Sequence, residues 1–161
     1  MKKITSLIVA ISIILLVGCG GGASNNTINL GGTFELNGST ITANYLLDGW
    51  VHPTNEYDAA FDGNKAVVVN ITVEAGDEEF SELSSNFSLG YGSEVVESTN
   101  YVGITDDSGL HNCGATVKAL ATETTTCDLV FEVLEGSDVS APTFVYEPLF
   151  GDIEAQTFEL K

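Results

Sequence analysis

Residues 65–73 read Lys-Ala-Val-Val-Val-Asn-Ile-Thr-Val, the clearest strand pattern in the chain. Apolar side chains recur at every second position, at Val67, Val69, Ile71 and Val73, which is the period of a β-strand. The intervening positions mix small, apolar and polar residues on the opposite face. The pattern therefore predicts a central strand whose apolar face lies in a core.

The same period of two appears upstream, on both sides of Asn37-Gly38. Residues 34–36 and 40–42 flank this dipeptide, and Asn-Gly between alternating segments is a strong signal for a tight hairpin turn. We expect the second strand to continue through 45–47 toward Trp50. The following segment, 48–64, is rich in Gly, Asn and Asp and contains a proline, so it predicts a long loop.

Downstream, several short segments repeat the alternation. We expect strands within 86–89, 94–102, 115–121, 125–133, 143–146 and 153–160. A charged turn at 76–79 and loop-like segments at 103–114 and 136–142 separate them. The chain is therefore predicted to be all-β, a two-sheet sandwich of about seven to nine short strands without a helix.

The N-terminus carries an export signal. Two lysines precede the apolar run 4–17, which is too short to span a membrane because a spanning helix needs roughly 20 residues. The run ends in Leu16-Val17-Gly18-Cys19, which resembles the bacterial lipobox. The resemblance implies cleavage before Cys19 and acylation of its thiol, so that the acyl chains anchor the chain to a membrane. An ordinary secretory peptide with an incidental cysteine is the alternative.

This interpretation divides the chain into three parts. Residues 1–18 are the lipoprotein signal peptide, 19–27 the lipidated cysteine and a flexible tether, and 28–161 the β-sandwich domain. The residue after Cys19 is Gly20 and not aspartate, which resembles the default for outer-membrane sorting. We therefore expect a lipid-anchored protein of the Gram-negative outer membrane, on its periplasmic or its surface face.

The charge of the chain limits its partners. The formal net charge is −18, and once residues 1–18 are removed three lysines face 23 carboxylates, which gives −20. Such a surface repels nucleic acid and anionic lipid headgroups, so the expected partners are the membrane, through the lipid anchor, and another envelope protein. Solubility explains the acidity, and binding of divalent cations or cationic peptides is the alternative.

With Cys19 assigned to lipid, the chain retains two cysteines, Cys113 and Cys127. An even pair in an exported protein predicts a disulfide. It would close a loop of about 15 residues and stabilise the fold by roughly 3 kcal/mol. The spacing does not fit a zinc site.

Much of the mature chain resembles the telokin-like, immunoglobulin-fold domains of small bacterial lipoproteins. The resemblance rests on the Gly63-Asn64-Lys65 lead-in to the valine strand, on Phe87 and Leu89, on 129–133 and on 144–146. Two segments depart from the family pattern, at 74–76 and around the two cysteines. The resemblance implies an immunoglobulin-like sandwich that is not an enzyme.

Three sets of loop residues are candidates for binding. Carboxylates that could hold calcium occur at Asp58, Asp62, Asp106 and Asp107, although none is in the register of a calcium loop, and solvated charge is the simpler interpretation. An aromatic set, Trp50, Tyr57 and Phe61, predicts either a binding surface or a cap on the end of the sandwich. His52 and His111 are expected to be solvated loop residues, with a metal site as the alternative.

No nucleophile, base and oxyanion site converge in the sequence, so we expect neither catalytic residues nor a cofactor. The leading hypothesis is a non-catalytic envelope lipoprotein whose sandwich is an interaction or accessory module. The alternative hypothesis is a protein that binds calcium or a cationic ligand through its acidic loops.

Overall fold

The structure is a computed structural model that describes residues 26–52, 60, 63–99, 108–148 and 155–160. The predictions for Cys19 and the signal peptide lie outside these residues. The described strands are β1 (Asn26–Leu36), β2 (Ser39–Trp50), β3 (Asn64–Glu74), β4 (Phe80–Leu83), β5 (Phe87–Tyr91), β6 (Glu94–Thr99), β7 (Thr116–Ala119), β8 (Thr124–Leu134), β9 (Thr143–Tyr146) and β10 (Gln156–Glu159). A short 3₁₀ turn, η2 (Ser84–Asn86), joins β4 to β5.

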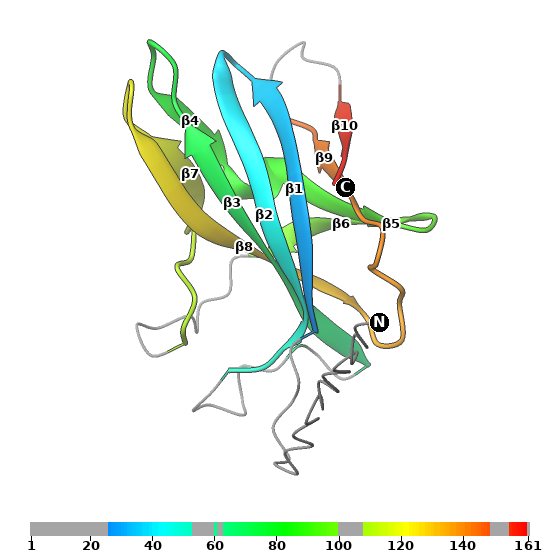
Figure 1. Ribbon diagram of the computed structural model, residues 1–161. Helices are drawn as coiled ribbons and strands as arrows, with labels where there is room; N and C mark the ends of the chain where they lie inside the picture. The colour runs from blue at the N-terminus through cyan, green and yellow to red at the C-terminus, as the bar shows by residue number, and fades with distance from the viewer. Residues whose placement is uncertain (1–25, 53–59, 61–62, 100–107, 149–154, 161) are drawn as a thin grey trace, which may run out of the picture.

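Eight strands form one antiparallel sheet in the order β1-β2-β3-β8-β6-β5-β9-β10, and β4 and β7 form a second, smaller sheet. Strand β6 makes the link, because Ser98 and Thr99 pair with β8 while Glu94 to Glu97 pair with β5. The long strands β1, β2, β3 and β8 form one layer, and β5, β6, β9 and β10 lie behind it (Figure 1). The predicted all-β sandwich is confirmed.

Strand β3 is central, as the valine pattern predicts. It pairs with β2 on one side and with β8 along its whole length on the other. Val67, Val69, Ile71 and Val73 are fully buried in the main core. Burying a side chain of this size stabilises the folded state by roughly 1.5–3 kcal/mol.

The core between the two layers is aromatic. Phe144 of β9 lies with its ring centroid 6.0 Å from Phe34 of β1 and 6.2 Å from Phe131 of β8. The two edges of the sheet also approach each other, because Phe34 stacks on Phe158 of β10 at 3.9 Å. A Cβ on Gly32 would lie 3.3 Å from the carbonyl oxygen of Glu159, a tight contact that shows how closely β1 approaches β10. The sandwich is thus nearly closed on itself.

The predicted Asn-Gly hairpin joins β1 to β2. Asn37 and Gly38 have φ of 50° and 76°, the left-handed conformation that a two-residue turn of this type requires. The turn rests on Gly76, since a Cβ at that position would collide with the Gly38 carbonyl oxygen. The departure from the telokin-like pattern at 74–76 therefore coincides with a close backbone approach.

The structure corrects four details of the sequence prediction. The described residues hold ten strands, and β4 was not predicted because its four residues follow the charged turn and include Ser81 and Glu82. Residues 48–50 belong to β2 and Asn64 belongs to β3, so the loop between them is shorter than expected. Strand β1 begins at Asn26, inside the segment expected to be tether.

Within the part of the chain that the structure describes, no helix has the length and apolar character needed to cross a membrane.

Candidate functional site

The aromatic candidate Trp50 is a core residue. It is 5% exposed and packs with Ala66, Val68 and Val130 in a second apolar cluster on the outer side of β3 and β8. Trp50 therefore caps apolar surface and is not part of an open binding surface. Its two predicted companions, Tyr57 and Phe61, lie outside the described residues.

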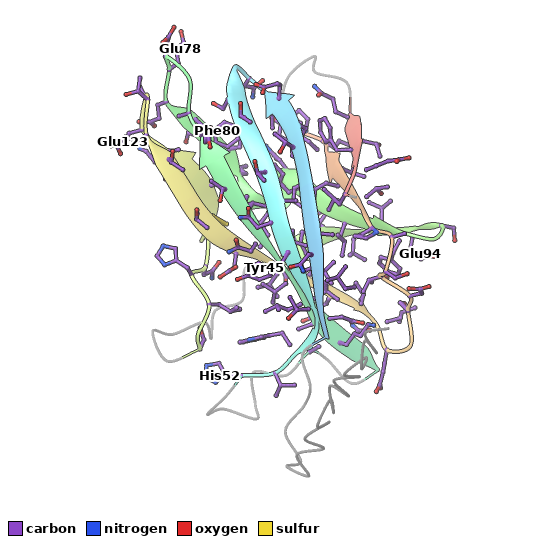
Figure 2. The ribbon with its side chains drawn as sticks, in the orientation of Figure 1. Tyr45, His52, Glu78, Phe80, Glu94 and Glu123 are labelled. Carbon is purple, nitrogen blue, oxygen red and sulfur yellow. A yellow bond between two sulfur atoms is a disulfide. The ribbon has the colours of Figure 1, made fainter. Side chains whose placement is uncertain are left out.

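The two histidines differ in their environments. His52 follows the end of β2 (Figure 2) and is 5% exposed. Its ring lies edge-on to the ring of Trp50, at a centroid distance of 5.8 Å. The expectation of a solvated histidine is therefore wrong for His52, because the second apolar cluster extends to it. His111 is exposed, as expected.

The calcium candidates Asp58, Asp62, Asp106 and Asp107 lie outside the described residues, so their prediction stays untested. Among the residues that are described, no three His, Cys, Asp or Glu side chains gather in a group that could hold a metal ion.

A network of polar side chains crosses the outer face of the front layer. The Asn44 amide donates to the Asn70 oxygen at 2.8 Å and to the Thr72 hydroxyl at 2.9 Å. The Asn70 amide in turn donates to Oδ1 of Asp128 at 2.7 Å. Asp128 is a buried carboxylate, 3% exposed. The hydrogen bonds through Asn70 and Asn44 connect it to β2.

The second oxygen of Asp128 fastens the loop 108–114 to β8. It accepts the backbone N–H of His111 at 2.6 Å. The Asp128 backbone also donates to the His111 carbonyl at 2.7 Å and accepts the Cys113 N–H at 3.1 Å. Both carboxylate oxygens of Asp128 are thus hydrogen-bonded, as a buried charge requires.

The predicted disulfide strengthens the same attachment. Cys113 and Cys127 are joined, with their Cα atoms 4.9 Å apart. The bridge places the loop against β8 one residue before Asp128. We call the polar side chains of Asn44, Asn70, Thr72, Thr126 and Asp128, together with the loop 108–114, the strapped face.

The electrostatics of the strapped face extend to Tyr45. Burial raises the pKa of the Tyr45 phenol, and the nearby Asp128 carboxylate raises it further. Both causes disfavour the phenolate. Two threonines also belong to this face, and the hydroxyls of Thr72 and Thr126 share a hydrogen bond of 2.9 Å.

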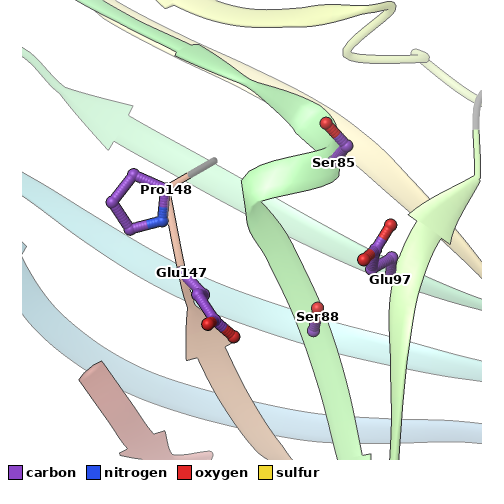
Figure 3. A pocket seen from close by; sticks show the side chains of 5 residues that line it. All are labelled: Ser85, Ser88, Glu97, Glu147 and Pro148. Atoms are coloured by element: carbon purple, nitrogen blue, oxygen red, sulfur yellow. The ribbon is translucent and has the colours of Figure 1, made fainter. Parts of the chain in front are cut away.

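The back layer presents a pocket of a different kind. A hollow of about 280 Å³ is lined by Ser85, Ser88, Glu97, Glu147 and Pro148. Ser88 of β5 lies between the two glutamates, with Glu97 on β6 and Glu147 just after β9 (Figure 3). We call these five residues the serine pocket.

The sheet register explains why these side chains meet. Ser88 is paired directly with Glu97 on one side and with Val145 on the other, and side chains paired in this way share a face. Glu147 lies two residues beyond Val145, so it returns to that face. Phe87 and Leu89 point into the core, which leaves Ser88 on the outer side.

Backbone contacts hold the walls of the serine pocket. The Glu147 N–H donates to the Asn86 carbonyl at 2.9 Å, and the Ser98 hydroxyl donates to the Ser84 carbonyl at 2.5 Å. These bonds attach the end of β9 and strand β6 to η2, whose middle residue is Ser85. The pocket is therefore formed by ordered backbone.

Tyr146 lies behind the pocket, on the inner side of β9. It is fully buried, and burial together with the neighbouring Glu82 carboxylate raises the pKa of Tyr146 to about 12. Glu82 also accepts the side-chain amides of Asn37 at 2.8 Å and Asn86 at 3.1 Å. The hydroxyl of Tyr146 itself makes no well-aligned hydrogen bond with a described residue. The hydrogen bonds from Asn37 and Asn86 to Glu82 connect the β1–β2 hairpin to η2.

The sequence analysis did not identify the serine pocket. Glu97 and Glu147 are far apart along the chain, and only the strand order β6-β5-β9 brings them to either side of Ser88. The available signal was Ser88 itself, a hydroxyl between two buried apolar residues in a predicted strand.

Solved structures with a similar fold come from other bacteria. A Bacillus subtilis protein described as a candidate lipoprotein (YcdA) aligns with a TM-score of 0.54 and 17% identity over 80% of this chain. This chain spans only 38% of the length of that protein. A functionally unknown protein from Listeria monocytogenes aligns with a TM-score of 0.51 and 13% identity, over 86% of this chain and 89% of that one.

A third structure, an uncharacterised β-sandwich protein from Clostridium difficile, aligns with a TM-score of 0.44 and 11% identity, over 83% of this chain and 93% of that one. No protein-family model matches the sequence, and the telokin-like assignment therefore stays a prediction. No curated protein matches it either.

Proposed function

We propose that the chain is a non-catalytic envelope lipoprotein whose sandwich is an accessory or interaction module held close to a membrane. The observation that carries this proposal is the lipobox-like sequence from Leu16 to Cys19, placed shortly before a folded β-domain that begins at Asn26. A similar fold in a protein described as a candidate lipoprotein supports the proposal.

The distance between Cys19 and β1 gives the proposal a geometric consequence. Asn26 is seven positions after Cys19, with six residues between them, and an extended chain spans at most about 3.6 Å per position. The anchor would therefore keep the sandwich within about 25 Å of the bilayer surface. A partner would be another protein of the same envelope, and the outer membrane is the proposed site.

The test of the anchor is a Cys19→Ala substitution in the full-length chain. The unchanged protein is expected to sediment with membranes, to resist extraction by high salt and alkali, and to enter the detergent phase. Cys19→Ala should leave the membrane fraction, because it carries no acyl chains and the apolar run 4–17 is too short to span a bilayer. Density-gradient separation of the two membranes then tests the outer-membrane location.

The matched control is the Cys113→Ala/Cys127→Ala double variant, which removes the two other cysteines and their disulfide and retains Cys19. It is expected to stay in the membrane fraction. Membrane retention of Cys19→Ala, or loss of the control from the membrane at unchanged expression, contradicts the proposed anchor. Crosslinking in intact cells tests the accessory role, and recovery of the chain alone under several crosslinkers contradicts it.

A further inference from the structure

We propose that the serine pocket binds a primary ammonium group on an alkyl stem, held between Glu97 and Glu147 and hydrogen-bonded to Ser88. The inference goes beyond the proposed anchoring and accessory role and does not depend on it, because the pocket is complete within one folded chain. Four steps lead to it.

The first step is a hydroxyl that faces the hollow. Ser88 is 7% exposed, its side chain lines the pocket, and the hydroxyl has no hydrogen-bond partner among the described residues. Figure 3 shows it projecting between the two glutamates. The Ser88 oxygen is not among the described side-chain atoms that are both enclosed and unpaired, so it opens to the hollow and can bond a group that enters it.

The second step is the charge of two exposed carboxylates, Glu97 and Glu147. Neither Glu97 nor Glu147 forms an ion pair with a described residue, because Lys65 is held by Asp48 at 2.7 Å and Lys118 by Glu79 at 3.0 Å. Two carboxylates on either side of one hydroxyl make a negative potential, and the net charge of −18 adds to it. The pocket therefore attracts a cation.

The third step is the shape of the acceptor set. An ammonium carries three N–H donors and no acceptor, which matches two carboxylates and one hydroxyl arranged around a common point. Strand β6, which carries Glu97, and strand β9, which ends just before Glu147, each lie about 4.8 Å from β5, so both side chains can reach a group above Ser88. Pro148 offers apolar surface for an alkyl stem.

The fourth step favours an organic cation over a metal ion. Calcium takes six to eight oxygen ligands, commonly with several carboxylates, whereas this pocket presents two carboxylates and two serine hydroxyls. Its volume of about 280 Å³ also exceeds what a bare ion needs and approaches that of small-molecule sites. An aminoalkyl group fills such a space better.

Two sources carry this chemistry, a free aliphatic diamine and the lysine side chain of a partner protein. The experiment is a calorimetric titration of the full-length chain in detergent, at low ionic strength. The first probe is 1,5-diaminopentane and the second is a lysine blocked at both its amino and carboxyl ends. Tighter binding of the diamine indicates a free amine, and tighter binding of the blocked lysine indicates a protein partner.

The variants locate the binding. Glu97→Gln and Glu147→Gln are each expected to weaken binding of the better probe by about tenfold or more, because each removes a charge-assisted hydrogen bond. Ser88→Ala should weaken it by about fivefold. Raising the salt concentration should weaken binding of both probes to the unchanged protein.

The matched control is Glu94→Gln, which removes one charge from an exposed position on the same strand as Glu97. It should change the affinity by less than about twofold, since it lies outside the pocket and acts only through screened charge. Unfolding curves for all variants confirm that they are folded.

Three results overturn the proposal. One is the absence of binding by both probes to a folded protein. Another is binding that Glu97→Gln and Glu147→Gln leave unchanged. The last is binding of calcium chloride, abolished by the same two variants, at concentrations where neither amine binds. None of these results bears on the membrane location of the chain, so failure here is distinguishable from failure of the anchor.

Discussion

The strapped face and the serine pocket lie on opposite outer faces of the sandwich. They differ in whether a polar side chain of low exposure has hydrogen-bond partners within the chain. Asp128 and Ser88 are almost equally buried, 3% and 7% exposed. Asp128 is hydrogen-bonded through both oxygens to Asn70 and His111, whereas the Ser88 hydroxyl has no partner among the described residues. Burial alone therefore does not distinguish a structural polar group from one open to a ligand.

The difference arises from the loops that cover each face. The loop 108–114 turns a backbone N–H toward Asp128 and is fastened by the disulfide, so it satisfies the carboxylate. On the back layer, two backbone carbonyls of η2 accept hydrogen bonds from the Glu147 N–H and the Ser98 hydroxyl. Neither bond involves Ser88, which stays open to the hollow. A covered, satisfied network stabilises the fold, and an open, unsatisfied one is available for binding.

The largest expected effect is the loss of the disulfide. The Cys113→Ala/Cys127→Ala double variant should lower the free energy of unfolding by about 3 kcal/mol, because the bridge closes a loop with a sequence separation of 14. Urea denaturation measures this. Adding reductant to the unchanged protein should reproduce the loss and should have no effect on the variant.

A loss below about 1 kcal/mol would show that the Asp128 hydrogen bonds hold the loop without help from the bridge. Ammonium binding at the serine pocket should be the same in this variant, because the disulfide joins the loop to β8 and not to a residue that lines the pocket. A parallel loss of binding would remove the distinction between the two faces.

Asp128→Asn is expected to cost about 2 kcal/mol of unfolding free energy. An amide has one acceptor and one NH₂ group, so either the Asn70 amide or the His111 N–H would meet a donor in place of an acceptor. The control is Glu123→Gln, which removes one charge from the exposed turn before β8 and should change stability by less than about 0.5 kcal/mol.

The same variant has a second readout in Tyr45. Because the Asp128 charge is the smaller of two causes that raise the pKa of Tyr45, Asp128→Asn should lower that pKa only part of the way toward its ordinary value. An absorbance titration of tyrosinate formation measures the change. An unchanged pKa together with unchanged stability would show that the carboxylate does not organise the strapped face.

The parts of the fold that sequence could predict are those with local causes. The Asn37-Gly38 turn, the valine alternation of β3 and the strand at 143–146 depend on residues adjacent in the chain, and all three are confirmed. The pairing of Cys113 with Cys127 followed from counting cysteines after Cys19 was set aside, and the bridge is present.

The parts that sequence missed have causes distant in the chain. Burial of His52 depends on the apolar outer surface of β3 and β8, which no local pattern of loop residues contains. The serine pocket depends on the order in which β6, β5 and β9 lie side by side. The acidic loops became candidates because charged residues can be identified from a sequence. Whether a hydroxyl has a hydrogen-bond partner can be determined only from a structure.

The smallest expected effects come from two buried serines in adjacent strands of the back layer. Ser98 and Ser88 are 8% and 7% exposed, but only Ser98 donates a hydrogen bond, to the Ser84 carbonyl. Ser98→Ala should therefore lower the unfolding free energy by about 1 kcal/mol, while Ser88→Ala should leave it unchanged or raise it by a few tenths, about 0.3 kcal/mol. Urea denaturation of the two variants in parallel, without added amine, measures the contrast.

Equal losses in both would mean that the Ser88 hydroxyl already has a partner within the folded chain, and the serine pocket would then resemble the strapped face. A loss for Ser98→Ala alone, followed by stabilisation of the unchanged protein but not of Ser88→Ala on addition of 1,5-diaminopentane, would identify Ser88 as a binding group whose partner comes from outside the chain.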